Sequence, residues 1–170
     1  PIHMPGRLLY LRDNASHDFW SATWMPVPKP LEKFKYECRH GTAYTTIRSR
    51  YAGIATEATY FVPLGRAFEV WMFSVTNHTK KPRDLSAWTY VEFANDWIVT
   101  SDQLDLQYSQ FLIKSDMVDG VLNTGFLRNC DSWLEGVETQ DQGRNSFLTV
   151  VGADIAGFDT RREVFLGPYG

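Results

Sequence analysis

This sequence has few cysteines, no large excess of positive or negative charge, and no long apolar run. The 170 residues include only two cysteines, Cys38 and Cys130, which are too few for a disulfide scaffold and have no CxxC spacing. This pattern favours buried free thiols in a reducing compartment, and we therefore expect a cytoplasmic protein. A single disulfide between the two cysteines is the alternative.

The charge is close to balanced. The formal net charge is −3, from 17 basic and 20 acidic residues, and the basic residues are scattered along the chain. A nucleic-acid-binding surface needs clustered lysines and arginines, so the sequence argues against a nucleic-acid partner and favours neutral or weakly charged ligands. No apolar run approaches the roughly 18 residues that cross a bilayer, which argues against a membrane partner.

Motifs for metals and common cofactors are also absent. The four histidines form no HxH, HxxxH or Cys/His cluster. The sequence has no GxGxxG, no GxxxxGK[ST] and no GxSxG, which leaves nucleotide binding and elbow-type acyl transfer without support. We therefore expect neither a metal nor a cofactor.

Short strand-like segments are what the sequence does contain. With 44% hydrophobic and 15% aromatic residues, it can form one domain with a core. Thr42 to Tyr51 and Ile54 to Val62 alternate around Ala52-Gly53, which predicts an antiparallel hairpin. Asp119-Gly120 predicts a second hairpin. Further strands are expected at Leu8 to Leu11, Phe68 to Thr76, Asp84 to Phe93, Phe111 to Val118, Val121 to Leu127 and Ser146 to Val151.

The order of these segments predicts the fold class. They follow one another without an amphipathic helix between them, which is typical of an all-β protein and favours an antiparallel β-sandwich. Phe68 to Thr76 is apolar on both faces, so we expect it to be covered on both sides.

Two long stretches lack a sustained helical or strand period, namely Tyr10 to Gly41 and Asn95 to Gln110. Long loops of this kind are often functional. Their acids, amides and tryptophans suit a sugar ligand, although tryptophans at strand ends are usually core and loop aspartates usually cap turns. The candidate residues are Asp13, Asp18, Trp20, Trp24, Asp96, Trp97, Asp102 and Gln107.

Cys38 is a candidate nucleophile because His40 follows two residues later. In an extended segment, residues i and i+2 point the same way, so the histidine can act as the base. Nothing in the sequence marks an oxyanion hole or a third group that orients the histidine, which favours a structural thiol instead.

A set of short motifs runs in order over nearly the whole chain: Gly6 to Asn14, Asp18 to Ser21, Trp24 to Pro26, Glu37 to Gly41, Tyr60 to Gly65, Val91 to Phe93 and Gly157 to Arg161. In this order they resemble the amino-terminal region of the cellobiose phosphorylase family. These are inverting β-glycoside phosphorylases, once classed as glycosyltransferases. Because the motifs are collinear, the resemblance is more specific than any single motif.

The resemblance implies a fold and a reaction. The fold is an amino-terminal β-sandwich of the super-sandwich type, and catalysis belongs to an α/α barrel that follows it. The chain is therefore expected to be a fragment of a larger multidomain enzyme, with no catalytic residue of its own and no activity alone. The reaction is reversible phosphorolysis of a β-linked glucosyl disaccharide or oligosaccharide to glucose 1-phosphate. An aspartic acid protonates the glycosidic oxygen while inorganic phosphate, a co-substrate, attacks the anomeric carbon with inversion.

The resemblance also implies partners. Family members are generally homodimers in which the loop corresponding to Asn95 to Gln110 approaches the partner subunit's acceptor site. Gln107 matches the family, whereas Tyr108 stands where cellobiose-specific members have an arginine. We therefore expect Gln107, Tyr108 and Asp102 to bind substrate in trans, with cellobiose, cellobionic acid, laminaribiose or a longer glucan as candidates.

The remaining candidates are expected at interfaces. Asp13, Asp18, Trp20 and Trp24, together with Asp96 and Trp97, would shape the surface that meets the barrel or the second subunit. Two other classes of protein stay open at this point: a free-standing carbohydrate-binding module without catalysis, and a purely structural dimerisation domain.

Overall fold

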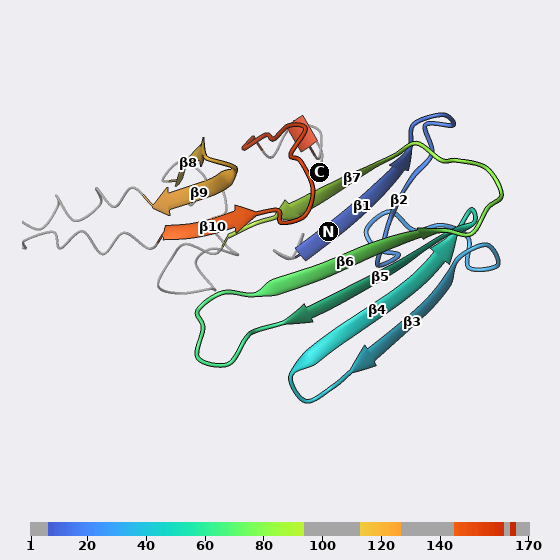
Figure 1. Ribbon diagram of the computed structural model, residues 1–170, viewed down its shortest axis with the longest axis horizontal. Helices are drawn as coiled ribbons and strands as arrows, with labels where there is room; N and C mark the ends of the chain where they lie inside the picture. The colour runs from blue at the N-terminus through green and yellow to red at the C-terminus, as the bar shows by residue number, and fades with distance from the viewer. Residues whose placement is uncertain (1–6, 94–112, 127–144, 162–163, 166–170) are drawn as a thin grey trace, which may run out of the picture. The chain divides into compact units, whose positions relative to one another are not determined.

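The computed structural model describes residues 7–93, 113–126, 145–161 and 164–165, and within them it has ten β-strands (Figure 1). All pairs of neighbouring strands are antiparallel. The chain divides into two compact units: Gly6–Glu92, and a second that joins Pro1–Pro5 to Phe93–Gly170. The predicted antiparallel all-β class is therefore confirmed.

The first unit contains a four-stranded sheet in the order β3-β4-β5-β6. The β4–β5 hairpin turns at Ala52 and Gly53, whose φ angles of 49° and 81° are those of a tight turn that follows the twist of its strands. The predicted hairpin is confirmed, with the strands one or two residues shorter. The bounds are β3 Lys35–His40, β4 Tyr44–Tyr51, β5 Ile54–Phe61 and β6 Val70–Asn77.

A three-stranded sheet in the order β2-β1-β7 forms the other layer of this unit. Its central strand pairs with β7 along its whole length, from Arg7 opposite Val91 to Asp13 opposite Leu85. The bounds are β1 Arg7–Asp13, β2 Phe19–Ser21 and β7 Leu85–Val91.

The core lies between these two layers. Leu11 of β1, Trp20 of β2 and Ile54 of β5 are each 1% exposed and pack in one cluster with Phe34. A second cluster joins Leu9 of β1 to alternate residues of β5. Burying a side chain of the size of Leu or Ile is worth about 1.5–3 kcal/mol, so the clusters explain why the sheets stack. The predicted sandwich is confirmed in this unit.

The prediction that Tyr10 to Gly41 has no strand beyond its beginning was wrong. β1 continues to Asp13, and the segment also contains β2 and β3. β2 has only three residues, too few to show a period. β3 is an edge strand that is largely exposed on both faces, so its residues show no alternation between apolar and polar side chains.

The expected coverage of Phe68 to Thr76 on both sides was also wrong within the described residues. Trp71 and Phe73 of β6 pack against the core, but Met72 is 59% exposed and Phe68 is 41% exposed. β6 is at the edge of its sheet, and the second layer covers only one face of that sheet. Apolar character on both faces therefore did not indicate burial on both faces.

The second unit contains a three-stranded sheet in the order β10-β9-β8. Asp119 and Gly120, with φ angles of 50° and 78°, form the turn between β8 and β9, which confirms the second predicted hairpin. The bounds are β8 Ile113–Val118, β9 Val121–Phe126 and β10 Asn145–Thr149. In the described part of the chain, no helix has the length and apolar character that a membrane span requires.

Candidate functional site

Asp18 lies just before β2 at the centre of a charged cluster. Its carboxylate is 2.5 Å from Lys29 Nζ and accepts a hydrogen bond of 2.9 Å from the Tyr51 hydroxyl. The ammonium of Lys29 also lies 5.6 Å from the centre of the Tyr51 ring, which is within the range of a cation–π contact. We call these three residues the Asp18 cluster.

The charges of the Asp18 cluster are stabilised by their neighbours. Desolvation raises the pKa of Asp18, but the hydrogen bonds from Lys29 and Tyr51 outweigh it, so the pKa lies below its usual value. Burial, followed by the hydrogen bond to Asp18, raises the pKa of Tyr51. At neutral pH, Asp18 is therefore an ionised acceptor and Tyr51 a protonated donor.

Two tryptophans hold the cluster in place. Trp24 donates a hydrogen bond of 2.9 Å from its indole to the carbonyl of Lys29, which fixes the proline-rich loop between β2 and β3. Trp20 is 1% exposed, and its ring centre is 5.2 Å from that of Tyr51. Trp20 is thus a core residue. This agrees with the expectation that tryptophans at strand ends usually belong to the core.

Asp13, at the end of β1, has a different set of partners. Its carboxylate is only 4% exposed and binds the Arg83 guanidinium and the backbone amides of Ala15 and Ser16. Arg83 donates a further hydrogen bond of 3.0 Å to the carbonyl of Ala52 in the β4–β5 turn. The bond from Arg83, and then that from Ser16, hold the pKa of Asp13 below its usual range.

Asp13 and Asp18 lie at either end of one turn. The amide of Asp13 donates to the carbonyl of Asp18 at 2.8 Å, whereas each side chain is bound to its own cation. Asp13 therefore caps the turn, and the ion pairs of Asp13 and Asp18 connect the turn to other segments of the chain. The roles of these acids and of Trp20 and Trp24 toward a barrel or second subunit stay predictions.

The other predicted site residues lie outside the described residues. These are Asp96, Trp97, Asp102, Gln107 and Tyr108. Their predicted contacts with substrate or partner therefore stay predictions.

The partners that sequence reasoning missed are Lys29, Tyr51 and Arg83. Lys29 stands between two prolines in a stretch without periodicity, and Tyr51 appears in the sequence only as the last residue of a strand. Arg83 is separated from Asp13 by 70 residues. Lys29 and Arg83 are each next to a proline in the sequence, but this position does not identify their partners.

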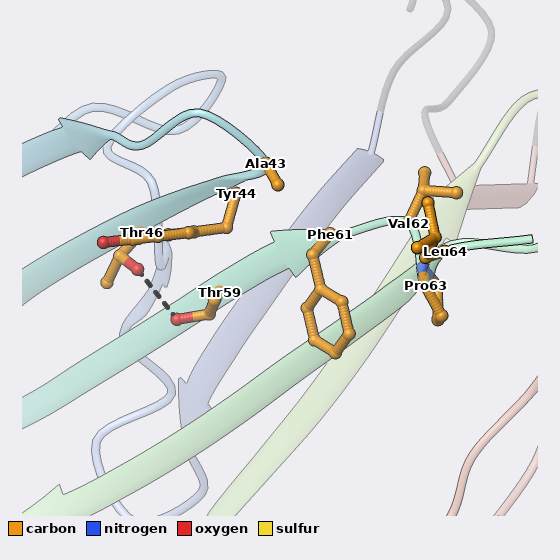
Figure 2. Close-up of a pocket in the computed structure, with 8 residues that line it drawn as sticks. All are labelled: Ala43, Tyr44, Thr46, Thr59, Phe61, Val62, Pro63 and Leu64. Carbon is orange, nitrogen blue, oxygen red and sulfur yellow. Dashed lines mark hydrogen bonds between the residues drawn. The ribbon is translucent and has the colours of Figure 1, made fainter.

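An open depression lies where β5 ends and β4 begins (Figure 2). It has a volume of about 480 Å³, and Tyr44 and Phe61, which are direct neighbours across the two strands, contribute aromatic rings to its lining. Figure 2 shows the hydrogen bond of 3.0 Å between the hydroxyls of Thr46 and Thr59 on the same face. The lining has no carboxylate, imidazole or thiol, so the depression suits contact rather than acid–base chemistry.

Metal ligation has little support where side chains are described. No group of three or more His, Cys, Asp or Glu side chains there is arranged to hold an ion. The expectation that the protein needs no metal stays a prediction.

A comparison with known families decides the membership of the chain. The family described as "Glycosyl hydrolase 94, supersandwich domain" matches residues 1–170. The chain belongs to this family. The expected amino-terminal supersandwich of this family, which rested on motifs that run in order over nearly the whole chain, is therefore confirmed.

Individual relatives of this supersandwich domain are phosphorylases of different sugars. An N,N'-diacetylchitobiose phosphorylase of Vibrio furnissii is 36% identical over 165 residues, which are 97% of this chain and 19% of that protein. A solabiose phosphorylase of Paenibacillus borealis is 27% identical over 96% of this chain and 20% of that protein. A cellobionic acid phosphorylase of Neurospora crassa is 32% identical over 51% of this chain and 11% of that protein.

The chain thus spans about one fifth of the length of these first two curated relatives. Their names differ in the disaccharide although the same domain is present in each. Membership in the supersandwich family therefore does not by itself determine the sugar.

Proposed function

We propose that this supersandwich domain is part of a glycoside phosphorylase that cleaves a β-linked disaccharide or short oligosaccharide with inorganic phosphate. The observation that supports the proposal is the collinear match of 97% of the chain to a disaccharide phosphorylase. The reaction is reversible and inverting, with phosphate as co-substrate and no cofactor.

The proposal assigns catalysis to another part of the protein, an α/α barrel. Within the described residues, Asp13 and Asp18 are the acids that the sequence favoured, and both are bound to cations. A general acid must be protonated near the working pH, whereas the pKa of each of these groups is lowered. This supports a non-catalytic role for the domain, and we expect the isolated chain to be inactive.

The role we propose for the domain is contact with sugar and with a second subunit of a homodimer. Gln107, Tyr108 and Asp102 would approach the acceptor site of the partner subunit. Cellobiose, cellobionic acid, laminaribiose and, from the relatives, N,N'-diacetylchitobiose are the substrates to compare. A cytoplasmic location is part of the same proposal.

The test uses the full-length protein with a panel of β-linked disaccharides, with and without inorganic phosphate. We expect release of a sugar 1-phosphate from at least one disaccharide, and no release when phosphate is omitted or when the 170-residue chain is used alone. Sugar binding without phosphorolysis would instead support a free-standing carbohydrate-binding module. Activity of the chain alone would overturn the assignment of catalysis to another domain.

A further inference from the structure

One face of the edge strand β3 has a row of reactive side chains that the proposed function does not use. Tyr36, Cys38 and His40 alternate along the strand and therefore point to the same side. His40 is directly opposite Thr45 of β4. We call these four residues the thiol row.

The distances within the thiol row are those of a nucleophile with its base. Cys38 Sγ, a free thiol, is 3.5 Å from His40 Nε2, and His40 Nδ1 is 3.0 Å from the hydroxyl of Thr45. A neutral imidazole has one donor and one acceptor nitrogen. When Nδ1–H donates to Thr45, Nε2 is the acceptor that faces the thiol proton.

The contact of Thr45 with His40 could not be predicted from the sequence. The spacing of Cys38 and His40 predicts that they lie side by side, but the orientation of the ring depends on a residue of the neighbouring strand. The register of β3 and β4 brings Thr45 to the far nitrogen of the ring. This removes one of the two arguments for a purely structural thiol.

Tyr36 flanks the thiol on its other side. Burial raises the pKa of Tyr36, and the charge and hydrogen bonding of Cys38 raise it further. The tyrosine therefore stays protonated at neutral pH and can donate a hydrogen bond to the sulfur. A thiolate at Cys38 would thus have a donor on each side, the Tyr36 hydroxyl and the protonated His40 ring.

Small reagents can reach this sulfur in the described part of the chain. Tyr36 is 48% exposed, Cys38 is half-buried and His40 is exposed. The neighbouring charged groups do not compete, because Glu37 and Arg39 pair with each other on the opposite face of β3. Two ligands, Cys38 and His40, are too few for a closed zinc site, whereas one thiol with a base is sufficient for covalent chemistry.

We propose that Cys38 is a site of covalent modification by small-molecule disulfides, at which His40 removes the thiol proton. The sulfur of Cys38 attacks one sulfur of the disulfide, so a new S–S bond forms and the original S–S bond breaks. The departing thiolate takes the proton from the protonated ring of His40. Cys38 is thereby oxidised to a mixed disulfide, and half of the reagent is reduced to a thiol.

The test is the rate at which glutathione disulfide modifies Cys38 in the full-length protein, followed by mass spectrometry of the Cys38 peptide, with Cys130 in the same digest as reference. His40→Gln should slow the reaction by about tenfold, less than a base contributes in an enclosed active site because the thiol row is open to water. Thr45→Val should slow it by a smaller factor. His78→Gln is the matched control, since His78 lies in the turn after β6 beside Gly53, at the other end of the sheet, and should leave the rate unchanged.

A second measurement needs no variant. The wild-type Cys38 should react faster in the native protein than in guanidinium chloride, because only the folded strand aligns Tyr36, His40 and Thr45 around the sulfur. Equal rates for wild type and a folded His40→Gln variant would overturn the proposal. So would an adduct that forms at Cys38 only after unfolding.

Discussion

Asp13 shows how a single side chain can join three parts of the first unit. It caps the turn after β1 through two backbone amides, and it binds Arg83, which reaches the carbonyl of Ala52 in another turn. The carboxylate is almost completely buried, and it is the ionised form that the bonds from Arg83 and the two amides favour. Its contribution to stability should therefore depend on pH.

Acid should weaken the fold through this group. The pKa of Asp13 is lower in the folded than in the unfolded chain, so its contribution is complete above the unfolded value of about 3.9 and is lost as the pH falls through the folded value. Asp13→Asn should lower the urea midpoint at pH 7 and make the loss of stability below about pH 4 less steep. Urea titrations from pH 7 to pH 2.5 measure both effects. Parallel curves for the two proteins would contradict the role of this charge.

Among the described residues, Trp20 is the largest side chain that is fully buried, at 1% exposure. Trp20→Ala should cost about 3–5 kcal/mol in the free energy of unfolding, because it leaves a cavity between the two sheets. The matched control is Phe19→Ala one residue earlier, where the ring is 52% exposed and the cost should be about 1 kcal/mol or less. Similar costs for the two variants, measured by urea titration, would mean that the sheets do not stack around Trp20.

The sequence was least informative about the contacts of single residues. Asp13, Asp18, Trp20 and Trp24 stood out by type, and the structure brings them to one end of the first unit. Their partners Lys29, Tyr51 and Arg83 did not stand out, because an ion pair or hydrogen bond between distant residues depends on strand register. Sequence patterns carry little information on which residues of different strands and loops meet.

Among the elements, the β4–β5 hairpin was the easiest to predict, and its turn explains why. Ala52 and Gly53 both have positive φ, a region in which alanine is strained by about 1–2 kcal/mol and glycine is not. A Cβ at position 53 would also overlap the methyl group of Thr79. The turn therefore needs glycine at its second position and tolerates alanine at the first.

The two turn positions should respond with opposite signs. Ala52→Gly should stabilise the protein by about 0.5–1 kcal/mol, since relief of backbone strain exceeds the added chain entropy. Gly53→Ala should destabilise it by about 1–2 kcal/mol or more. Thermal denaturation of both variants measures the two changes in stability. A loss of stability in Ala52→Gly would show that the strain at Ala52 is not the dominant effect.

Edge strands were harder to predict than hairpins. β3 was missed because it is exposed and charged, whereas β6 was recognised but assigned too much burial because it is apolar on both faces. Both errors have one physical cause: the pattern of a strand reports its own residues, not which neighbour covers them. In the thiol row, the Cys38–His40 pair was already a candidate in the sequence, and only the contact with Thr45 of β4 became visible in the structure.

For the whole molecule, the order of motifs was the most informative feature of the sequence. The motifs from Gly6 to Arg161 predicted the family, and the match over residues 1–170 confirmed it. The sugar could not be predicted. The segment Asn95 to Gln110, which we propose to approach the acceptor, lies outside the described residues, and the chain spans only about one fifth of the relatives' length.

A substitution of Tyr108 in the full-length protein tests the proposed role of this residue in acceptor choice. If it contacts the acceptor across the dimer, Tyr108→Ala in the full-length protein should change the ratio of kcat/KM between two disaccharides by about tenfold or more. Tyr108→Phe, which keeps the ring, is the control that separates stacking from hydrogen bonding. An unchanged ratio in both variants, with kcat/KM for each sugar also unchanged, would mean that this residue does not face the acceptor.

We propose above that this domain is part of an inverting glycoside phosphorylase. The most direct measurement is phosphorus NMR of the full-length protein incubated with a β-linked disaccharide and inorganic phosphate. Because phosphate would attack the face opposite the leaving group, we expect an α-configured sugar 1-phosphate as the first phosphorylated product. A β-configured product, or free sugar with no phosphorylated product, would contradict it.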